Sequence, residues 1–132
     1  MSEQDSRFQA GMATRRAVLG ESYVEGAERG KTKFTEDFQR FITETAWGAV
    51  WSRPGLTRRE RSLITIALLA AGGHDEEVAM HVRATANTGA TAQDIKEVLL
   101  HVALYAGIPA ANKAYKTANE ELAKLDTDGG IA

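Results

Sequence analysis

With 132 residues, 43% of them hydrophobic, and a net charge of −2, the chain is expected to form one domain with a buried core. The 16 Lys and Arg are balanced by 18 Asp and Glu, which argues against nucleic acid as a main partner because no basic excess is available for phosphates. The absence of cysteine excludes disulfides, thiolate metal ligands and Cys-based catalysis.

The N-terminal segment is polar, and the apolar runs at residues 63–71 and 98–104 are too short or too interrupted to span a bilayer. We therefore expect a soluble, cytoplasmic protein with no secretory signal and no membrane partner.

The first elements are predicted to be helical, since apolar residues recur with a helical period and no segment alternates apolar and polar residues for long. We expect disorder over residues 1–5 and a helix over residues 7–19 that ends near Gly20. A less regular segment, which contains Gly26 and Gly30, follows.

The next helix is predicted to begin after an N-cap at Thr35 and to end near Trp47. Its core-facing side chains are expected to be Phe38, Phe41, Ile42 and Thr45 or Ala46. A loop over residues 51–55 should follow, because a residue before proline avoids helical geometry, and Pro54 lies in this segment.

Two helices with clear boundary signals come next. The sequence Thr57-Arg-Arg-Glu60 is a capping-box pattern that opens a helix. This helix stops at Gly72 and Gly73, and it carries Ile64, Ala67, Leu68 and Ala71. The helix after it covers residues 74–88 and should end at Gly89, which suits a left-handed stop.

Two further helices complete the chain. Thr91-Ala-Gln-Asp94 opens a helix that ends at Gly107, with a buried stripe of Ile95, Val98, Leu99, Val102 and Ala106. Pro109 lies in the first turn of the last helix, where its missing N–H costs nothing.

Together these elements predict an all-α, single-domain bundle of about six helices over residues 1–132, with residues 1–5 and 126–132 disordered. Residues 63–71 and 98–106 are apolar on more than one face, which is more apolar surface than so small a chain can bury alone. We therefore expect self-association into a homo-oligomer to cover part of this surface.

The densest group of reactive side chains lies in residues 74–89. His74, Glu77 and His81 are spaced at i, i+3 and i+7, which puts all three on one face of a helix. Glu77 can hydrogen-bond His81, raise the pKa of the imidazole and fix its tautomer, and such a pair moves protons near neutral pH. The alternative is a surface Glu–His pair worth a few tenths of a kcal/mol.

His101 lies within a nearly continuous apolar run, with Glu97 and Tyr105 one helical turn away on either side. It is either a core histidine bonded to Tyr105 or to a backbone carbonyl, or a group that points into a partly dry pocket.

Arg61 and Arg83, each taken alone, are explained as solvated charges. Together they could clamp a carboxylate, because guanidinium binds carboxylates in a bidentate manner. Glu60 is explained by the capping box and is given no catalytic role.

Three other functions fit the residues less well. No metal is expected, because the sequence has neither the His-Glu-x-x-His pattern nor two Glu-x-x-His motifs. A helix-turn-helix around Gly89 would place Glu97 and little basic charge on its recognition helix. A helical oligomeric scaffold without chemistry is the third.

Four ordered motifs resemble the γ-carboxymuconolactone decarboxylase family, over residues 11–123. They are Trp47-Gly-Ala-Val-Trp51-Ser-Arg-Pro-Gly55-Leu, Arg59-Glu-Arg61-Ser-Leu-Ile-Thr-Ile-Ala-Leu, Glu76-Glu77-x3-His81-Val-Arg83-Ala-x2-Asn87-x-Gly89 and Glu97-Val-Leu-Leu-His101-Val-Ala-Leu-Tyr105-Ala-Gly107-Ile-Pro109-Ala-Ala. The earlier segment Gly20-Glu21-x-Tyr23-Val fits as well.

This family shares its all-helical fold with the alkylhydroperoxidase D proteins, whose Cys-x2-Cys-x3-His motif corresponds here to His74, Glu77 and His81. Dithiol peroxidase chemistry is therefore impossible in this chain. The resemblance implies instead the decarboxylation of 4-carboxymuconolactone to 3-oxoadipate enol-lactone in the protocatechuate branch of the β-ketoadipate pathway of aromatic catabolism. It also implies that no cofactor is used and that the chain forms a ring-like homo-oligomer, typically a hexamer.

For that reaction we expect His81 to donate the proton, oriented and charged by Glu77, with Arg61 as a further catalytic residue that binds a carboxylate or stabilises the oxyanion. The expected substrate-binding residues are Arg83, His101, Tyr105 and Asn87. Asn87 is alternatively a helix-end cap, and the role of His74 is left open.

Overall fold

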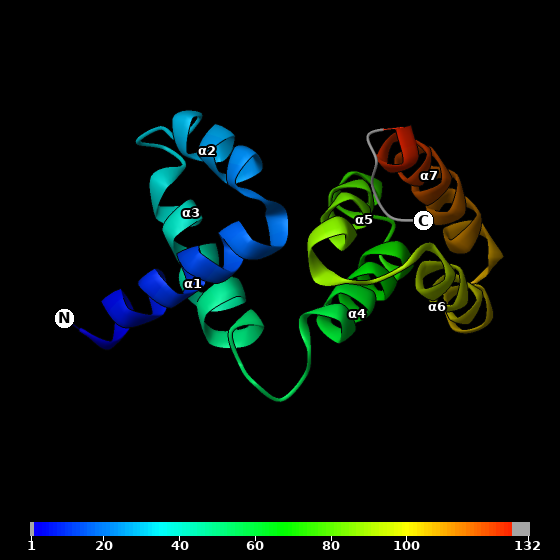
Figure 1. Cartoon of the computed structure of the whole chain (residues 1–132), viewed down its shortest axis with the longest axis horizontal. Helices are drawn as coiled ribbons and strands as arrows, with labels where there is room; N and C mark the ends of the chain where they lie inside the picture. The colour runs from blue at the N-terminus through cyan, green and yellow to red at the C-terminus, as the bar shows by residue number, and fades with distance from the viewer. Residues whose placement is uncertain (1, 128–132) are drawn as a thin grey trace. The chain divides into compact units, whose positions relative to one another are not determined.

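The structure is a computed structural model that describes residues 2–127. Within this range it has seven α-helices and one π-helix and no β-strand (Figure 1). In chain order these are α1 (Glu3–Leu19), α2 (Glu21–Arg29), α3 (Glu36–Ile42), the π-helix η1 (Thr43–Trp51), α4 (Arg58–Ala71), α5 (Asp75–Thr88), α6 (Ala92–Tyr105) and α7 (Ile108–Thr127). The all-α prediction is confirmed.

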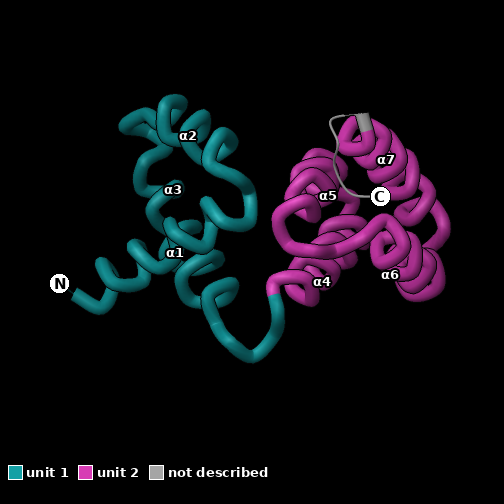
Figure 2. The backbone as a smooth tube through the Cα atoms, in the orientation of Figure 1, with its two compact units in different colours: residues 1–57 teal, residues 58–132 magenta. Residues whose placement is uncertain are grey.

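The helices form two compact units that divide between Thr57 and Arg58 (Figure 2). Unit 1 contains α1, α2, α3 and η1, and unit 2 contains α4 to α7. That residues 1–132 form a single domain stays a prediction.

Unit 1 is built on a close approach of α1 to η1. A Cβ on Gly11 of α1 would come within 2.8 Å of the Gly48 amide nitrogen, and a Cβ on Gly48 would come within 3.1 Å of the Arg7 carbonyl carbon. Only glycine lets the two backbones lie this close. Trp47 and Trp51 of η1 are buried, with ring centroids 5.0 Å apart.

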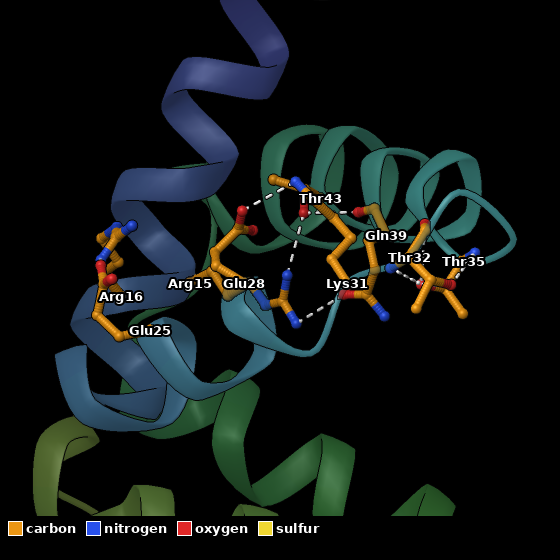
Figure 3. Close-up of polar contacts among 9 residues, drawn as sticks. All are labelled: Arg15, Arg16, Glu25, Glu28, Lys31, Thr32, Thr35, Gln39 and Thr43. Carbon is orange, nitrogen blue, oxygen red and sulfur yellow. Dashed lines mark hydrogen bonds and ion pairs between the residues drawn. The ribbon is translucent and has the colours of Figure 1, made fainter.

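Arg15 of α1 is buried against α3 and the start of η1 (Figure 3). Its guanidinium donates to Thr43 Oγ1 at 3.3 Å and to Gln39 Oε1 at 3.2 Å. The Thr43 hydroxyl in turn donates to the Gln39 carbonyl at 2.8 Å. These bonds turn the polar side of α3 toward α1.

The core face predicted for the helix after Thr35 is therefore wrong. Phe38 and Phe41 are 61% and 59% exposed, whereas Thr43 and Trp47 are buried. The prediction assumed a single α-helical period, but the chain changes at Thr43 to the wider π-helix, which alters the set of residues that share a face. The helix also continues to Trp51, so the loop begins only at Ser52.

The less regular segment predicted after Gly20 is α2. Arg16 of α1 pairs with Glu21 at 2.6 Å and with Glu25 at 2.5 Å, and Val24 between them is fully buried. These contacts to α1 outweigh the modest cost of Gly26 inside a helix, which is about 1 kcal/mol.

In unit 2 the helices α4 to α7 surround one apolar core, with α7 in contact with each of the other three. The buried core residues are Ile66, Ala70, Val78, Val82, Ile95, Leu99, Val102, Ala111, Ala114 and Ala118. Of the stripe predicted for α6, Ile95, Leu99 and Val102 are buried, Val98 is half-buried and Ala106 is exposed.

Helix boundaries in unit 2 follow the sequence signals. Thr91 and Asp94 form a full capping box, with both side-chain-to-backbone bonds at 3.0 Å. Gly89 ends α5 in the left-handed region at φ 85° and ψ 2°, and Pro109 lies in the first turn of α7.

Two predictions about the termini and the number of helices need correction. Ser2 caps α1 by accepting a hydrogen bond from the Asp5 amide at 3.0 Å, so residues 3–5 are helical rather than disordered. At the other end α7 continues to Thr127, and residues 128–132 lie outside the described residues. The predicted count of about six falls short because α2 and the π-helix were not anticipated.

Part of the apolar surface of unit 2 is exposed, as the sequence suggested. Leu68 of α4 and Leu104 of α6 are 67% and 73% exposed, and Tyr105 is 82% exposed. No helix within residues 2–127 is long and apolar enough to cross a membrane.

Candidate functional site

An open groove of about 330 Å³ lies between α4 and α6 of unit 2. This volume falls within the ~300–1,000 Å³ range of small-molecule sites. Its lining residues are Leu63, Ile64 and Ala67 of α4 and Glu97, Val98 and His101 of α6. One wall is therefore apolar, and the other presents a carboxylate and an imidazole.

An ion pair joins the beginnings of the two groove helices. Arg59 of α4 donates to both carboxylate oxygens of Asp94 of α6, at 2.6 and 2.8 Å. The Arg59 guanidinium, together with the hydrogen bond from Thr91, holds the pKa of Asp94 at about 2. The same carboxylate thus caps α6 and fixes it against α4.

His101 is exposed on the α6 wall, and its ring centroid lies 6.2 Å from that of Tyr105. Of the two interpretations that the sequence left open, the structure therefore supports a histidine that faces a pocket. Glu97 lies one helical turn earlier and lines the same groove.

His81 has the opposite environment. It is only 6% exposed, and burial lowers its pKa to about 4 against the opposing effect of Glu77. Burial thus favours the neutral form of the His81 imidazole, against the expectation that Glu77 keeps it charged. The reason is that Glu77 is exposed, so its attraction is weaker than the cost of burying a cation.

His74 does not join His81 inside unit 2, although the two share a helix face by spacing. It is the exposed N-cap residue of α5, and its side chain does not cap the helix. Of the three side chains that were predicted to share a helix face, that of His81 is thus buried, and those of His74 and Glu77 are exposed.

Arg83 of α5 pairs with Glu121 of α7 at 3.1 Å. Glu121 is 6% exposed and also accepts a hydrogen bond from Lys124 at 3.2 Å. Burial raises the pKa of Glu121, but the bonds and charges of Lys124 and Arg83 outweigh it, so that the pKa is lowered overall. The Glu121 carboxylate therefore holds the Arg83 guanidinium, while about half of the Arg83 side chain stays exposed to solvent.

Glu121 was missed by the sequence analysis, although a signal for it exists. The buried residues Ala111, Ala114 and Ala118 recur at helical spacing along α7, and Glu121 continues that line. A carboxylate on the buried face of a helix requires a cationic partner, and Arg83 is that partner.

Of the seven predicted site residues, only His101 lines the groove. Arg61 is half-buried on α4, two residues before Leu63, and Asn87 is exposed near the end of α5. Among residues 2–127, no group of three His, Asp or Glu side chains lies close enough to hold a metal ion.

Comparison with known proteins covers α4 and α6, the two helices that line the groove. The sequence model of the carboxymuconolactone decarboxylase family matches residues 36–120. A relative from Acinetobacter baylyi, 4-carboxymuconolactone decarboxylase, is 48% identical over 116 residues, which are 88% of this chain and 87% of the relative.

Two other relatives differ in what their names state. Nitrosuccinic acid decarboxylase of Metarhizium robertsii is 43% identical over 121 residues, 89% of this chain and 85% of the relative. An uncharacterised 15.0 kDa protein of Paracoccus denitrificans is 28% identical over 102 residues, 76% of each chain.

Proposed function

The chain belongs to the carboxymuconolactone decarboxylase family, and we propose that it is a carboxy-lyase that converts 4-carboxymuconolactone to 3-oxoadipate enol-lactone and CO2. One observation carries this proposal: the bacterial relative named for the reaction is 48% identical over 88% of this chain. The match to the family model, at residues 36–120, extends over the groove, Arg83 and all seven predicted site residues.

The substrate can supply its own electron sink. 4-Carboxymuconolactone is an unsaturated lactone in which one ring carbon carries both the leaving carboxylate and an acetate arm. When CO2 leaves, the electron pair of the broken C–C bond moves through the ring to the carbonyl oxygen and gives a furanolate. Protonation of the carbon next to the carbonyl then yields the enol-lactone. This reaction consumes one proton and calls for no cofactor.

The fungal relative's name points to a second substrate with the same logic. In nitrosuccinic acid the carbon that bears the nitro group also bears a carboxyl group and an acetate arm, and the nitro group can take the electron pair as a nitronate. The two molecules thus share a leaving carboxylate, an electron sink and a carboxymethyl arm on one carbon. We propose this shared arrangement as the substrate class of the chain.

The groove between α4 and α6 is the proposed substrate site. Its apolar wall of Leu63, Ile64 and Ala67 suits the ring and offers the leaving carboxylate a less solvated setting than water. We assign Arg61 and Arg83 to carboxylate binding or oxyanion stabilisation. His101 and Tyr105 are the proposed donors to the lactone, and Asn87 is a proposed substrate contact.

The proton-donor role of His81, oriented by Glu77, stays a prediction. Its burial and its lowered pKa of about 4 count against it, because a neutral imidazole has to give up its only N–H proton. Hydrogen bonding by the neutral ring is compatible with the same observations.

We also propose that the chain works as a homo-oligomer, a hexamer by family analogy, in the protocatechuate branch of aromatic catabolism in the cytoplasm. Leu68, Leu104 and Tyr105 support self-association, because a second copy would bury side chains that are 67%, 73% and 82% exposed. Light scattering after size-exclusion chromatography tests this, and a monomer at micromolar concentration would contradict it.

The activity is tested by following the ultraviolet absorbance of 4-carboxymuconolactone, generated in situ, with purified protein in a chelating buffer. Loss of the lactone with release of one CO2 per molecule is expected. A parallel assay with nitrosuccinic acid separates the two substrates. Turnover of neither compound would refute the proposed function.

A further inference from the structure

Two neighbouring arginines of α1 have opposite surroundings. Arg16 forms ion pairs with two carboxylates of α2. Arg15 is 4% exposed, and its hydrogen bonds go to neutral groups, the Thr43 hydroxyl at 3.3 Å and the Gln39 side-chain carbonyl at 3.2 Å (Figure 3). Within residues 2–127, no carboxylate lies at ion-pair distance from the Arg15 guanidinium.

The charge of Arg15 is therefore poorly compensated inside unit 1. Taking a cation out of water is costly, and buried cations are as a rule paired with an anion. Neutral acceptors offset only part of this cost. The Nε atom of Arg15 is also buried without a hydrogen-bond acceptor among the described residues. The Arg15 side chain thus offers both a positive charge and a donor to an anion.

A cavity of about 190 Å³ adjoins this guanidinium within unit 1. Its lining includes Gln39 and Thr43, the two residues that accept the hydrogen bonds of Arg15. The Gln39 side chain is half-buried, and its amide can donate as well as accept. A carboxylate in the cavity can therefore replace the Gln39 oxygen as an acceptor for Arg15, while the turned Gln39 amide donates to the same carboxylate.

We propose that unit 1 binds a small carboxylate anion in this cavity, with the Arg15 guanidinium as its main partner. A planar carboxylate matches the parallel N–H donors of a guanidinium better than a spherical ion does. The volume of about 190 Å³ lies below the ~300–1,000 Å³ of ordinary ligand sites, which favours a small ion. This site is separate from the reaction proposed for the groove in unit 2.

The other charged groups of the cavity set the expected strength of binding. The cations Lys31 and Arg40 line it, but both already pair with carboxylates of unit 1. Glu36 and Asp37, in the first turn of α3, line it as well and repel an anion. We therefore expect weak binding, with a dissociation constant in the millimolar range, that depends on Arg15.

An acetate titration of the whole protein tests the proposal. Acetate replaces chloride at constant ionic strength, so that general screening stays the same. Tryptophan fluorescence is the readout, since Trp47 and Trp51 both lie in η1, which begins at Thr43. A saturable change with one dissociation constant is expected. A response that only rises linearly with acetate, or no response, would overturn the proposal.

The two neighbouring arginines supply matched variants. Arg15→Gln should weaken acetate binding by about 10–100-fold, the usual worth of a hydrogen bond to a charged group. Arg16→Gln removes a guanidinium that is already paired, and it should leave the affinity for acetate unchanged. Equal losses of affinity in the two variants would indicate a general effect of charge and refute the role of Arg15.

Two further variants keep the test decisive if Arg15→Gln does not fold. Asp37→Asn removes an exposed carboxylate from the lining and should strengthen acetate binding, whereas an unchanged affinity would mean that acetate binds elsewhere. His101→Gln alters the groove of unit 2 and should leave the fluorescence response to acetate in place. If His101→Gln abolishes that response, acetate binds in the groove, and the inference fails while the proposed function stands.

Discussion

The close contact between α1 and η1 allows the effect of Gly11→Ala on the free energy of unfolding to be predicted. Gly11→Ala places a methyl group against backbone atoms of η1, within 2.8 Å of the Gly48 nitrogen. Backbone atoms cannot rotate away as a side chain can, so the two helices must separate. Gly26→Ala on α2 is the matched control, because its methyl group would find only the end of the Arg29 side chain, at 3.9 Å.

The two substitutions share one favourable effect and differ in the other. Alanine is better than glycine inside a helix by about 1 kcal/mol. Overpacking of a tight contact costs about 1–3 kcal/mol, and the upper part of that range applies where the neighbour is backbone. We expect Gly11→Ala to lower the free energy of unfolding by about 1–2 kcal/mol, and Gly26→Ala to raise it by about 0.5–1 kcal/mol.

Urea unfolding followed by tryptophan fluorescence measures this directly. Both tryptophans of the chain, Trp47 and Trp51, are buried in η1, so the signal reports the contact itself. Far-UV circular dichroism of the same samples reports all the helices. If Gly11→Ala proves as stabilising as Gly26→Ala, the close approach of α1 to η1 is not required and the reasoning is refuted.

Three further predictions follow from the ionisable groups. Asp94→Asn should lower the free energy of unfolding by about 1 kcal/mol, because it weakens a helix cap and the contact with Arg59. The pKa of Asp94 in the folded protein, about 2, lies below its usual value of 3.8, so the wild type should lose this contribution as the pH falls from about 4 toward 2. Urea titrations at several pH values measure this loss. Burial lowers the pKa of His81 from 6.5 to about 4, so this residue should stabilise the fold above pH 6.5, and the stabilisation should be lost as the pH falls toward 4. The free energy of unfolding of His81→Gln should lack this dependence on pH. An NMR titration that shows a charged His81 at pH 6 would refute the prediction. Glu121→Gln should lower the free energy of unfolding by about 1–3 kcal/mol, because Arg83 and Lys124 lose a charged acceptor. A double-mutant cycle with Arg83→Gln should show that the two residues are coupled. Additive effects would mean that the ion pair at 3.1 Å contributes nothing to stability.

Elements defined by local chemistry were predictable from the sequence. The Thr91–Asp94 capping box and the Gly89 stop are made by side chains and backbone within a few residues, so their signals do not depend on the rest of the fold. The interior of the N-terminal unit was not predictable in this way. Phe38 and Phe41 are exposed because Arg15, more than twenty residues earlier, turns Gln39 and Thr43 inward.

Charged residues show the same limit. The ion pair of Arg59 with Asp94 joins residues 35 apart, and Arg83 with Glu121 joins two helices that are not consecutive. A helical pattern tells which residues of one helix share a face, but it does not tell which helix that face meets. The sequence thus identified no partner for Arg83, whereas the structure places the Glu121 carboxylate 3.1 Å from its guanidinium.

The environments of His81 and His101 show what spacing along the chain cannot predict. Each histidine lies four residues after a glutamate, on α5 and on α6, and the difference in their burial comes from the neighbouring helices. His81 lies beside the buried Val78 and Val82, in the part of α5 that the core encloses. His101 lies between Leu100 and Leu104, which are 52% and 73% exposed within the described residues. An apolar run that exceeds what the core can enclose was visible in the sequence around His101. That excess, rather than the histidine motif itself, is the physical reason to expect a groove there, because a face that the chain cannot bury stays open to a substrate or to a second copy.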